Sequence, residues 1–279
     1  MTDTAFQNQY RQEHIAVFEQ NYSMLRSCCV QEAMIKGNAA IFLVSGSGGA
    51  TAVTRGVNGI IPYGVIDNSQ LTCTIVEKHA PFEKTGFNIF ASQGDQKRIM
   101  QMASTAVLNR DIDQVIIDEL DTATVDTGTS AIASLDMVMK SRAILGIAEV
   151  PIWEEDNMFA VVTPSFDAYL HQITEFANAQ YVDVKPMTGP VRKMRRWAGV
   201  NWMIHPNLTG VGTSTEKCYM WHRNSIGHAA DSKEMRVEVD YDRKQDTSWS
   251  RATLFHGAKL LQNTGIVQMK HDGSAYVGA

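Results

Sequence analysis

The residue types that could support chemistry are present in this 279-residue chain, but their spacing fits no familiar site. The four cysteines lack metal-ligand spacing and form no disulfide framework. The histidines are scattered, and the closest pair, His222 and His228, has neither metal spacing nor a cysteine beside it. The G-x-S-x-G motif of esterases does not occur. We therefore expect no catalytic residues, no metal, no cofactor and no enzymatic activity.

A glycine-rich run at residues 46–49, Gly-Ser-Gly-Gly, raises the question of a phosphate-binding loop. The dinucleotide pattern requires a glycine at position 51, which is Thr51, and the lysine of a P-loop is missing. No helical pattern follows the run. It is therefore more typical of a flexible β-hairpin than of a nucleotide site.

Charged residues gather in three places, and each allows more than one interpretation. A basic patch consists of Lys193, Arg195 and Arg196 beside Trp197. It could contact a phosphate backbone, an acidic neighbour, or only solvent. Carboxylates cluster at residues 118–121 and again at 154–156, where they could bind a cationic partner, although a solvated face is the simpler interpretation.

The composition predicts a soluble, folded protein. The formal net charge is −5, and 44% of the residues are hydrophobic, which is enough for a substantial core. Net acidity excludes binding to nucleic acid by bulk charge alone. No apolar run approaches the roughly 18 residues of a membrane span, and residues 1–14 show no signal-peptide core. We expect synthesis in the cytosol and no membrane partner.

Two N-terminal segments carry apolar side chains that neither segment can cover by itself. Residues 1–36 are a polar arm with a helix-like apolar spacing, which could dock on its own core or on a neighbouring subunit. Residues 37–76 contain only two charges, Arg55 and Asp67, and favour two strands around a glycine-rich turn. Arms of about 20 residues would reach about 60 Å. We therefore expect certain apolar side chains to contact an adjacent subunit: Ile41, Leu43, Ile60, Ile61 and Ile75.

The rest of the chain alternates helical and extended patterns. A long helix is predicted for residues 92–121, with Ser92 and Asp95 at its start. A second helix is predicted for residues 131–146. A short strand at residues 158–162 leads into a helix that Thr163 caps and Pro164 begins. Strict alternation predicts strands at residues 235–241 and 266–269. These elements predict an α+β fold.

The order of these segments resembles the major capsid proteins of tailed phages, which share the Hong Kong 97 (HK97-like) fold. Five local stretches carry the resemblance: residues 37–42 (GNAAIF), 83–87 (EKTGF), 110–117 (RDIDQVII), 158–164 (MFAVVTP) and 265–269 (GIVQM). The resemblance implies an N-terminal arm, an extended hairpin loop, a peripheral domain around a spine helix, and an α/β axial domain. Their expected ranges are 1–36 for the arm, 37–83 for the loop, 84–125 with 231–279 for the peripheral domain, and 126–230 for the axial domain.

The resemblance also implies a structural function. The chain would assemble with itself into pentamers and hexamers of an icosahedral shell that encloses double-stranded DNA by non-specific contacts. A separate scaffolding protein, a portal and a decoration protein are implied partners, and the shell would form in the bacterial host cytoplasm and become the virion. The candidate contacts between subunits are Ile41, Leu43, Arg55, Ile60, Ile61, Ile75, Lys193, Arg195 and Arg196.

Two other functions stay open at this point. One is an encapsulin-like cellular shell that holds cargo enzymes instead of DNA. The other is a soluble α/β enzyme whose site the sequence does not reveal. A particle of megadalton mass would eliminate the enzyme.

Overall fold

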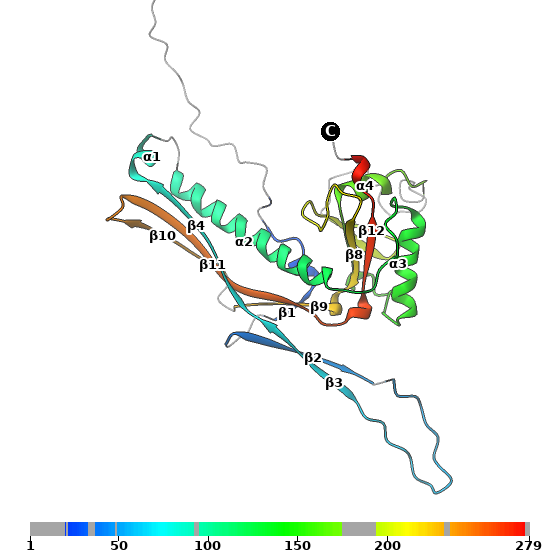
Figure 1. Ribbon diagram of the computed structural model, residues 1–279. Coiled ribbons are helices and arrows are strands. Elements are labelled where there is room, and N and C mark those ends of the chain that lie inside the picture. Colours follow the sequence, from blue (N-terminus) through cyan, green and yellow to red (C-terminus); the bar gives the residue numbers. More distant parts are fainter. Residues whose placement is uncertain are drawn as a thin grey trace, which may run out of the picture. The chain divides into compact units, whose positions relative to one another are not determined.

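The computed structural model of the chain contains two compact units (Figure 1). The first unit comprises residues 1–23, 77–112 and 233–255, and the second comprises residues 24–76, 113–232 and 256–279. The structure describes residues 20, 22–32, 37–47, 49–91, 95–174, 194–231 and 235–276. The predicted division into arm, loop, peripheral domain and axial domain stays a prediction.

The described residues combine helices with three sheets, which confirms the predicted α+β class. The helices are α1 (Gly86–Ala91), α2 (Gln96–Asp121), α3 (Leu135–Ile147) and α4 (Pro164–Leu170). The strands are β1 (Val30–Glu32), β2 (Ala39–Gly46), β3 (Asp67–Thr74), β4 (Val76–Thr85), β5 (Met158–Val162), β6 (Arg195–Trp197), β7 (Val200–Ile204), β8 (Glu216–His222), β9 (Ile226–Ala230), β10 (Arg236–Asp242), β11 (Thr247–Leu260) and β12 (Ile266–His271). Short 3₁₀ turns join several of them, at Arg26–Cys28, Glu155–Asn157, Arg223–Ser225, Asn263–Gly265 and Ser274–Tyr276.

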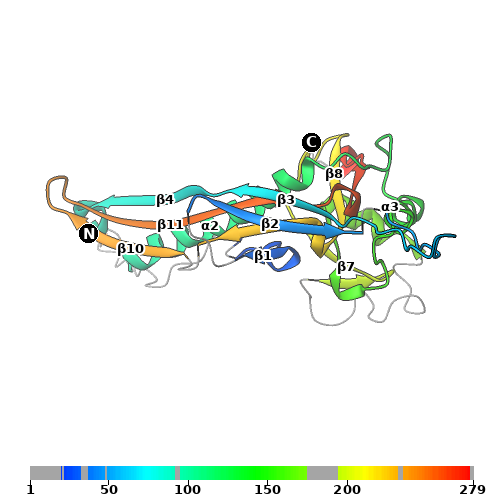
Figure 2. The same ribbon diagram turned by 90° about the horizontal axis from the view of Figure 1, so that it is seen from below.

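In the first unit, α2 covers one face of β4, β10 and β11, which belong to a five-stranded sheet that also contains β1 and β9 (Figure 1). β10 and β4 both pair with β11, and Figure 2 shows the three strands side by side. Every second residue of β11 from Ser248 to His256 is buried, including Ser250 and Ala252. The Ser250 hydroxyl lies 3.4 Å from that of Ser104 on α2. The buried face of β11 therefore packs on the helix, and the alternate face bears larger side chains such as Trp249 and Arg251.

The long helix α2 begins four residues later than the sequence predicts. The Asp95 carboxylate accepts a hydrogen bond from the Arg98 N–H at 3.2 Å and caps the helix. Ser92, the other predicted start residue, lies outside the described residues. The helix is confirmed to Asp121, and its buried side is a stripe of residues three or four apart: Met100, Ser104, Leu108, Ile112, Ile116 and Leu120.

The core of the second unit is a five-stranded sheet in the order β12–β8–β5–β7–β6. β5 is buried along its whole length. It pairs in parallel with β7 and antiparallel with β8. The next helix, α4, starts as predicted: the Thr163 hydroxyl accepts the Phe166 N–H at 3.2 Å, and Pro164 is the first helical residue. Helix α3 packs against β12. The predicted strand-to-helix step is thus confirmed at residues 158–164.

The N-terminal segment differs from its predicted helix. Of residues 1–36, the structure describes only residues 20 and 22–32. These form the 3₁₀ turn Arg26–Cys28 and the strand β1, which pairs in parallel with β9. Leu25, Cys28 and Cys29 are buried in the second unit, so this part of the arm docks on its own chain. The backbone of this segment forms hydrogen bonds with other parts of the chain, such as Asp113 and Trp221, in place of the bonds within a helix.

Candidate functional site

The predicted hairpin is confirmed, because β2 and β3 pair antiparallel from Ala39 with Thr74 to Gly46 with Asp67. Its base is packed within the second unit, which corrects the expectation that the hairpin buries none of its apolar residues on its own chain. Ala40, Phe42 and Cys73 form a buried cluster with Ala229, and Ile75 packs against it. Ile75 is therefore partly covered by its own chain, and its contact with an adjacent subunit stays a prediction.

Two glycines make this close packing possible. A Cβ at Gly227 would lie 2.8 Å from the Phe42 ring. A Cβ at Gly257 would clash with the carbonyl oxygen of Thr74 and lie 3.1 Å from the Cys73 Sγ. The base of the hairpin therefore rests directly on the backbone of β9 and β11.

The Gly257→Ala substitution should lower the free energy of unfolding by about 1–3 kcal/mol, because it overpacks the hairpin base. Urea denaturation of the unassembled subunit measures this change. The matched control is Gly64→Ala, whose new Cβ would lie at an ordinary 3.6 Å from the Ala50 Cβ. A Gly257→Ala variant as stable as the control would show that the base is not tightly packed.

Beyond its base, the hairpin exposes large apolar side chains. Ile41 and Leu43 point away from the buried cluster and are 60% and 70% exposed, as the alternation of a strand requires. In the connecting segment, Ile60 is 68% and Ile61 46% exposed. Arg55 lies in the same turn, and among the described residues it donates only to the Gly59 carbonyl, at 3.2 Å. These five predicted contact residues are thus available to a partner.

The basic patch is largely neutralised by carboxylates of its own chain. Arg195 lies 3.6 Å from the Asp167 carboxylate and 2.8 Å from the His171 ring. Arg196 forms ion pairs with Glu155, at 3.2 Å, and Asp156. Lys193 lies outside the described residues. The acidic run at 154–156 and the basic patch, which the sequence presents separately, therefore meet in the fold.

The carboxylates at the end of α2 also have partners within the second unit. Glu119 lies 3.7 Å from the Lys259 ammonium and accepts the Leu260 N–H at 3.0 Å. Asp121 accepts hydrogen bonds from Lys217 and from the Tyr219 hydroxyl. These two acids join α2 to β11 and β8, so they do not need a cationic partner from elsewhere.

A buried carboxylate that the sequence reading missed holds the N-terminal segment in place. Asp113 is fully buried on α2 and accepts the backbone N–H groups of Met24, at 2.9 and 3.1 Å, and Leu25, at 3.1 Å. The His205 ring lies 3.4 Å away. The sequence did contain a signal, since Asp113 lies three and seven residues before Ile116 and Leu120 and so falls on the apolar stripe of the helix.

Two buried histidines lie close together between β9 and β11. The rings of His228 and His256 are 5.6 Å apart, and both side chains are 1% exposed. Burial, helped by His256 and by Arg26, lowers the pKa of His228 from 6.5 to about 3. The folded protein therefore keeps His228 neutral at pH values where the unfolded chain is protonated.

This difference predicts that acid destabilises the second unit. Below pH 6.5 the unfolded state binds a proton that the folded state excludes, so stability falls as the pH drops towards 3. His228 alone should cost about 2 kcal/mol between pH 7 and pH 5. Urea denaturation at both pH values should show this loss in the wild type and a smaller one in His228→Gln. Equal losses in the two proteins would contradict the assignment to His228.

The described parts of the chain contain no arrangement that suggests catalysis or metal binding. No group of three or more His, Cys, Asp or Glu side chains among the described residues could hold a metal ion. Burial raises the pKa of the Cys218 thiol to about 12, so it is protonated at neutral pH. The buried Glu216 carboxylate accepts bonds from Thr163 and Ser165 and joins β8 to the start of α4. None of the helices within the described ranges has the length and hydropathy of a membrane span.

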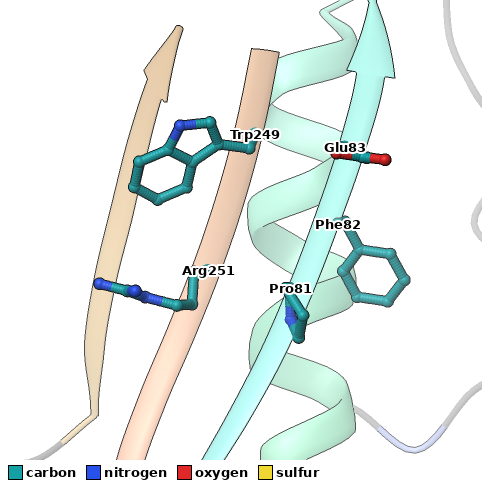
Figure 3. A pocket seen from close by; sticks show the side chains of 5 residues that line it. All are labelled: Pro81, Phe82, Glu83, Trp249 and Arg251. Atoms are coloured by element: carbon teal, nitrogen blue, oxygen red, sulfur yellow. The ribbon is translucent and has the colours of Figure 1, made fainter. Parts of the chain in front are cut away.

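The outward face of the first unit's sheet contains a shallow hollow of about 450 Å³ (Figure 3). It is lined by Pro81, Phe82 and Glu83 of β4 and by Trp249 and Arg251 of β11. Arg251 lies over the Trp249 ring, 5.6 Å from its centroid, and forms an ion pair with Glu238 of β10 at 2.6 Å. Trp249 and Arg251 lie on the face of β11 opposite its buried Ser248 and Ser250, and Glu83 and Arg251 add charge to an otherwise apolar lining.

A family model described as "Phage capsid protein" matches residues 2–273 of the chain. Among curated protein sequences, none matches it.

Several solved structures have the same fold at low sequence identity. A structure of Mycobacterium phage Che8 has a TM-score of 0.77 at 16% identity, and the match covers 96% of this chain and 98% of that one. The capsid of Ralstonia phage GP4 has a TM-score of 0.74 at 11% identity, with 99% and 98% covered. The capsid of a native GTA particle has a TM-score of 0.70 at 13% identity, with 96% of both chains covered.

Proposed function

This chain belongs to the phage capsid protein family and is a structural major capsid protein with the HK97-like fold, and from this premise we propose that its copies assemble into a closed icosahedral shell. The observation that carries the proposal is the exposed apolar segment of the hairpin, since Ile41, Leu43 and Ile60 are each at least 60% exposed in the single chain. Exposed apolar patches of this kind mark contacts between proteins. A neighbouring subunit would cover them.

Pentamers and hexamers would build this shell. A closed shell requires heterologous contacts, in which two different surfaces of the subunit meet. Repeated around a ring, these contacts must bring the last subunit back to the first. In this proposal, the candidate contacts are the exposed hairpin residues Ile41, Leu43, Arg55, Ile60 and Ile61. Arg195 and Arg196 are weaker candidates, because carboxylates of the same chain already pair with them.

The proposed shell encloses double-stranded DNA of a tailed phage and forms in the cytoplasm of the bacterial host. The net charge of −5 is consistent with non-specific packaging rather than tight binding of DNA by the subunit. A separate scaffolding protein, a portal and a decoration protein are the other proposed partners. The comparisons support a capsid and give no support to the encapsulin-like shell or the soluble enzyme.

The experiment that tests assembly is the particle mass of the purified protein, expressed with and without a scaffolding protein from the same phage. Size-exclusion chromatography with light scattering should show a species of megadalton mass, and electron microscopy should show closed shells. A protein that stays monomeric at all concentrations, with the scaffolding protein present, would refute the proposal.

A further inference from the structure

A polar pocket of about 210 Å³ lies in the second unit, where the end of α3 meets the 3₁₀ turns Arg223–Ser225 and Asn263–Gly265. Among the described residues that line it, none is a lysine or an arginine. These lining residues all belong to one unit, so a single copy of the chain contains the pocket. The side chains that can form hydrogen bonds are those of Glu149, His222, Asn224, Ser225, Gln262 and Thr264.

Hydrogen bonds fix one wall of the pocket in place. The Ser225 hydroxyl donates to the Gly265 carbonyl at 3.0 Å, and the Ser225 carbonyl accepts the N–H groups of Leu261 and Gln262 at 2.9 and 3.1 Å. A Cβ at Gly265 would clash with the Ser225 hydroxyl, so glycine allows the two turns to approach this closely. The pocket is therefore formed by the fold itself, as small-molecule sites usually are.

Glu149 occupies an unfavourable position at the end of α3. Its φ is 60°, the left-handed conformation that glycine usually adopts after a helix. Its N–H donates to the Gly146 carbonyl at 3.1 Å, which closes the last turn. Its carboxylate also lies at the negative end of the helix dipole, and within the described ranges no cation pairs with it. A residue with both costs indicates a function for its side chain.

His222 adds a buried donor without a partner. Only 4% of this residue is exposed. Its Nδ1 accepts the Asn224 N–H at 3.3 Å, so the neutral ring carries its proton on Nε2. In the part of the chain that the structure describes, Nε2 has no hydrogen-bond partner, and the Glu154 carboxylate at 3.6 Å is too distant to be one. A buried donor of this kind is stabilised when a ligand supplies the acceptor.

We propose that this pocket binds one ring of a sugar through its hydroxyl groups. A hydroxyl group can donate to the Glu149 carboxylate and can also accept from the His222 Nε2–H, so it matches both groups. An ammonium group would leave the His222 donor unpaired, and a phosphate would be repelled by Glu149. A terminal hexose of a glycan has the required chemistry.

Neighbouring groups extend the match to the rest of a sugar ring. The Asn224 amide and the Thr264 hydroxyl can each donate and accept, and the described residues supply neither with a side-chain partner. Trp153 lies in the turn from Pro151 to Glu154 and is 74% exposed. Its indole offers an aromatic surface to the C–H face of a ring.

Saturation-transfer NMR of the full-length protein tests this site with four probes, the methyl glycosides of glucose, galactose, mannose and N-acetylglucosamine. We expect at least one of them to bind the wild type with a dissociation constant of about 1 mM. Glu149→Gly removes the carboxylate and keeps the left-handed backbone, so the signal should vanish while the midpoint of thermal unfolding stays at or above that of the wild type. The matched control is Asp136→Asn, an exposed acid at the other end of α3, which should keep the signal.

A second variant and a second probe separate the sugar from other ligands. Asn224→Ala should raise the dissociation constant about fivefold, the effect of one lost hydrogen bond. Methylammonium, the probe for a cation site, should not bind. The inference would be overturned if no glycoside bound the wild type, if the signal persisted in Glu149→Gly, or if only methylammonium bound. Each of these results would leave the capsid function intact, because the pocket is complete within one subunit.

Discussion

Replacing Asp113 with alanine should lower the free energy of unfolding of the unassembled subunit by about 3 kcal/mol or more. The carboxylate is fully buried and accepts the N–H groups of Met24 and Leu25. Its removal leaves the buried Leu25 N–H and the partly buried Met24 N–H without their acceptor, at about 1–3 kcal/mol for a buried donor. Since the same bonds tie residues 24–32 to α2, amide protons of β1 should also lose protection.

Urea denaturation and amide exchange measure the two effects of Asp113→Ala. The matched control is Asp118→Ala on the same helix, because Asp118 is exposed and, within the part of the chain that the structure describes, accepts a hydrogen bond only from Gln114. That change should stay within about 0.5 kcal/mol of the wild type. If the two variants were equally stable, Asp113 would not be the anchor of the N-terminal segment.

Ala103→Pro in α2 should be at least as damaging, because proline removes a helix hydrogen bond and clashes with the preceding turn, at about 3 kcal/mol or more. Ala103 lies in the middle of the first half of α2, which covers the sheet of the first unit. Against a typical total stability of about 5–15 kcal/mol, this loss would unfold a large fraction of the subunits.

The fraction of soluble subunit and its thermal unfolding measure the effect of Ala103→Pro. The control is Lys97→Pro, which places the same residue in the first turn of α2, where no helix hydrogen bond is lost. We expect Lys97→Pro to fold and assemble. A soluble, assembly-competent Ala103→Pro variant would show that the helix does not depend on this position.

Elements whose own side chains form a regular apolar pattern could be predicted from the sequence. Helix α2 has a clear stripe with a period of 3.6 residues, and β10 alternates strictly. The step from β5 to α4 carries its own capping chemistry in Thr163 and Pro164. In these places local propensity, pattern and capping agree with the final fold.

The longest strand, β11, could not be found in this way. Its buried face bears Ser248, Ser250 and Ala252, which are small and partly polar, while Trp249 and Arg251 lie on the outward face. The hydropathy of the strand is therefore inverted relative to its burial. Only the close approach of α2 explains why small residues occupy the buried face, and a single sequence does not reveal which segments meet.

The candidate contact residues, too, could be predicted only where no distant segment of the chain covers them. The exposed hairpin residues Ile41, Leu43, Ile60 and Ile61 were predictable because a glycine-rich segment with only two charges is too long to cover itself. By contrast, the packing of Phe42 and Cys73 at the hairpin base depends on Gly227 and Gly257, which are far away in the chain. The partners of Arg195 and Arg196 likewise come from distant segments.

The central claim is that assembly buries the exposed part of the hairpin between copies. Amide hydrogen exchange over residues 41–46 and 49–72, measured on unassembled subunits and on purified particles, tests it most directly. We predict rapid exchange at residues 49–66 in the free subunit and strong protection in the particle, while the base near Cys73 is protected in both. Equal exchange of residues 49–66 in the two forms would contradict the claim.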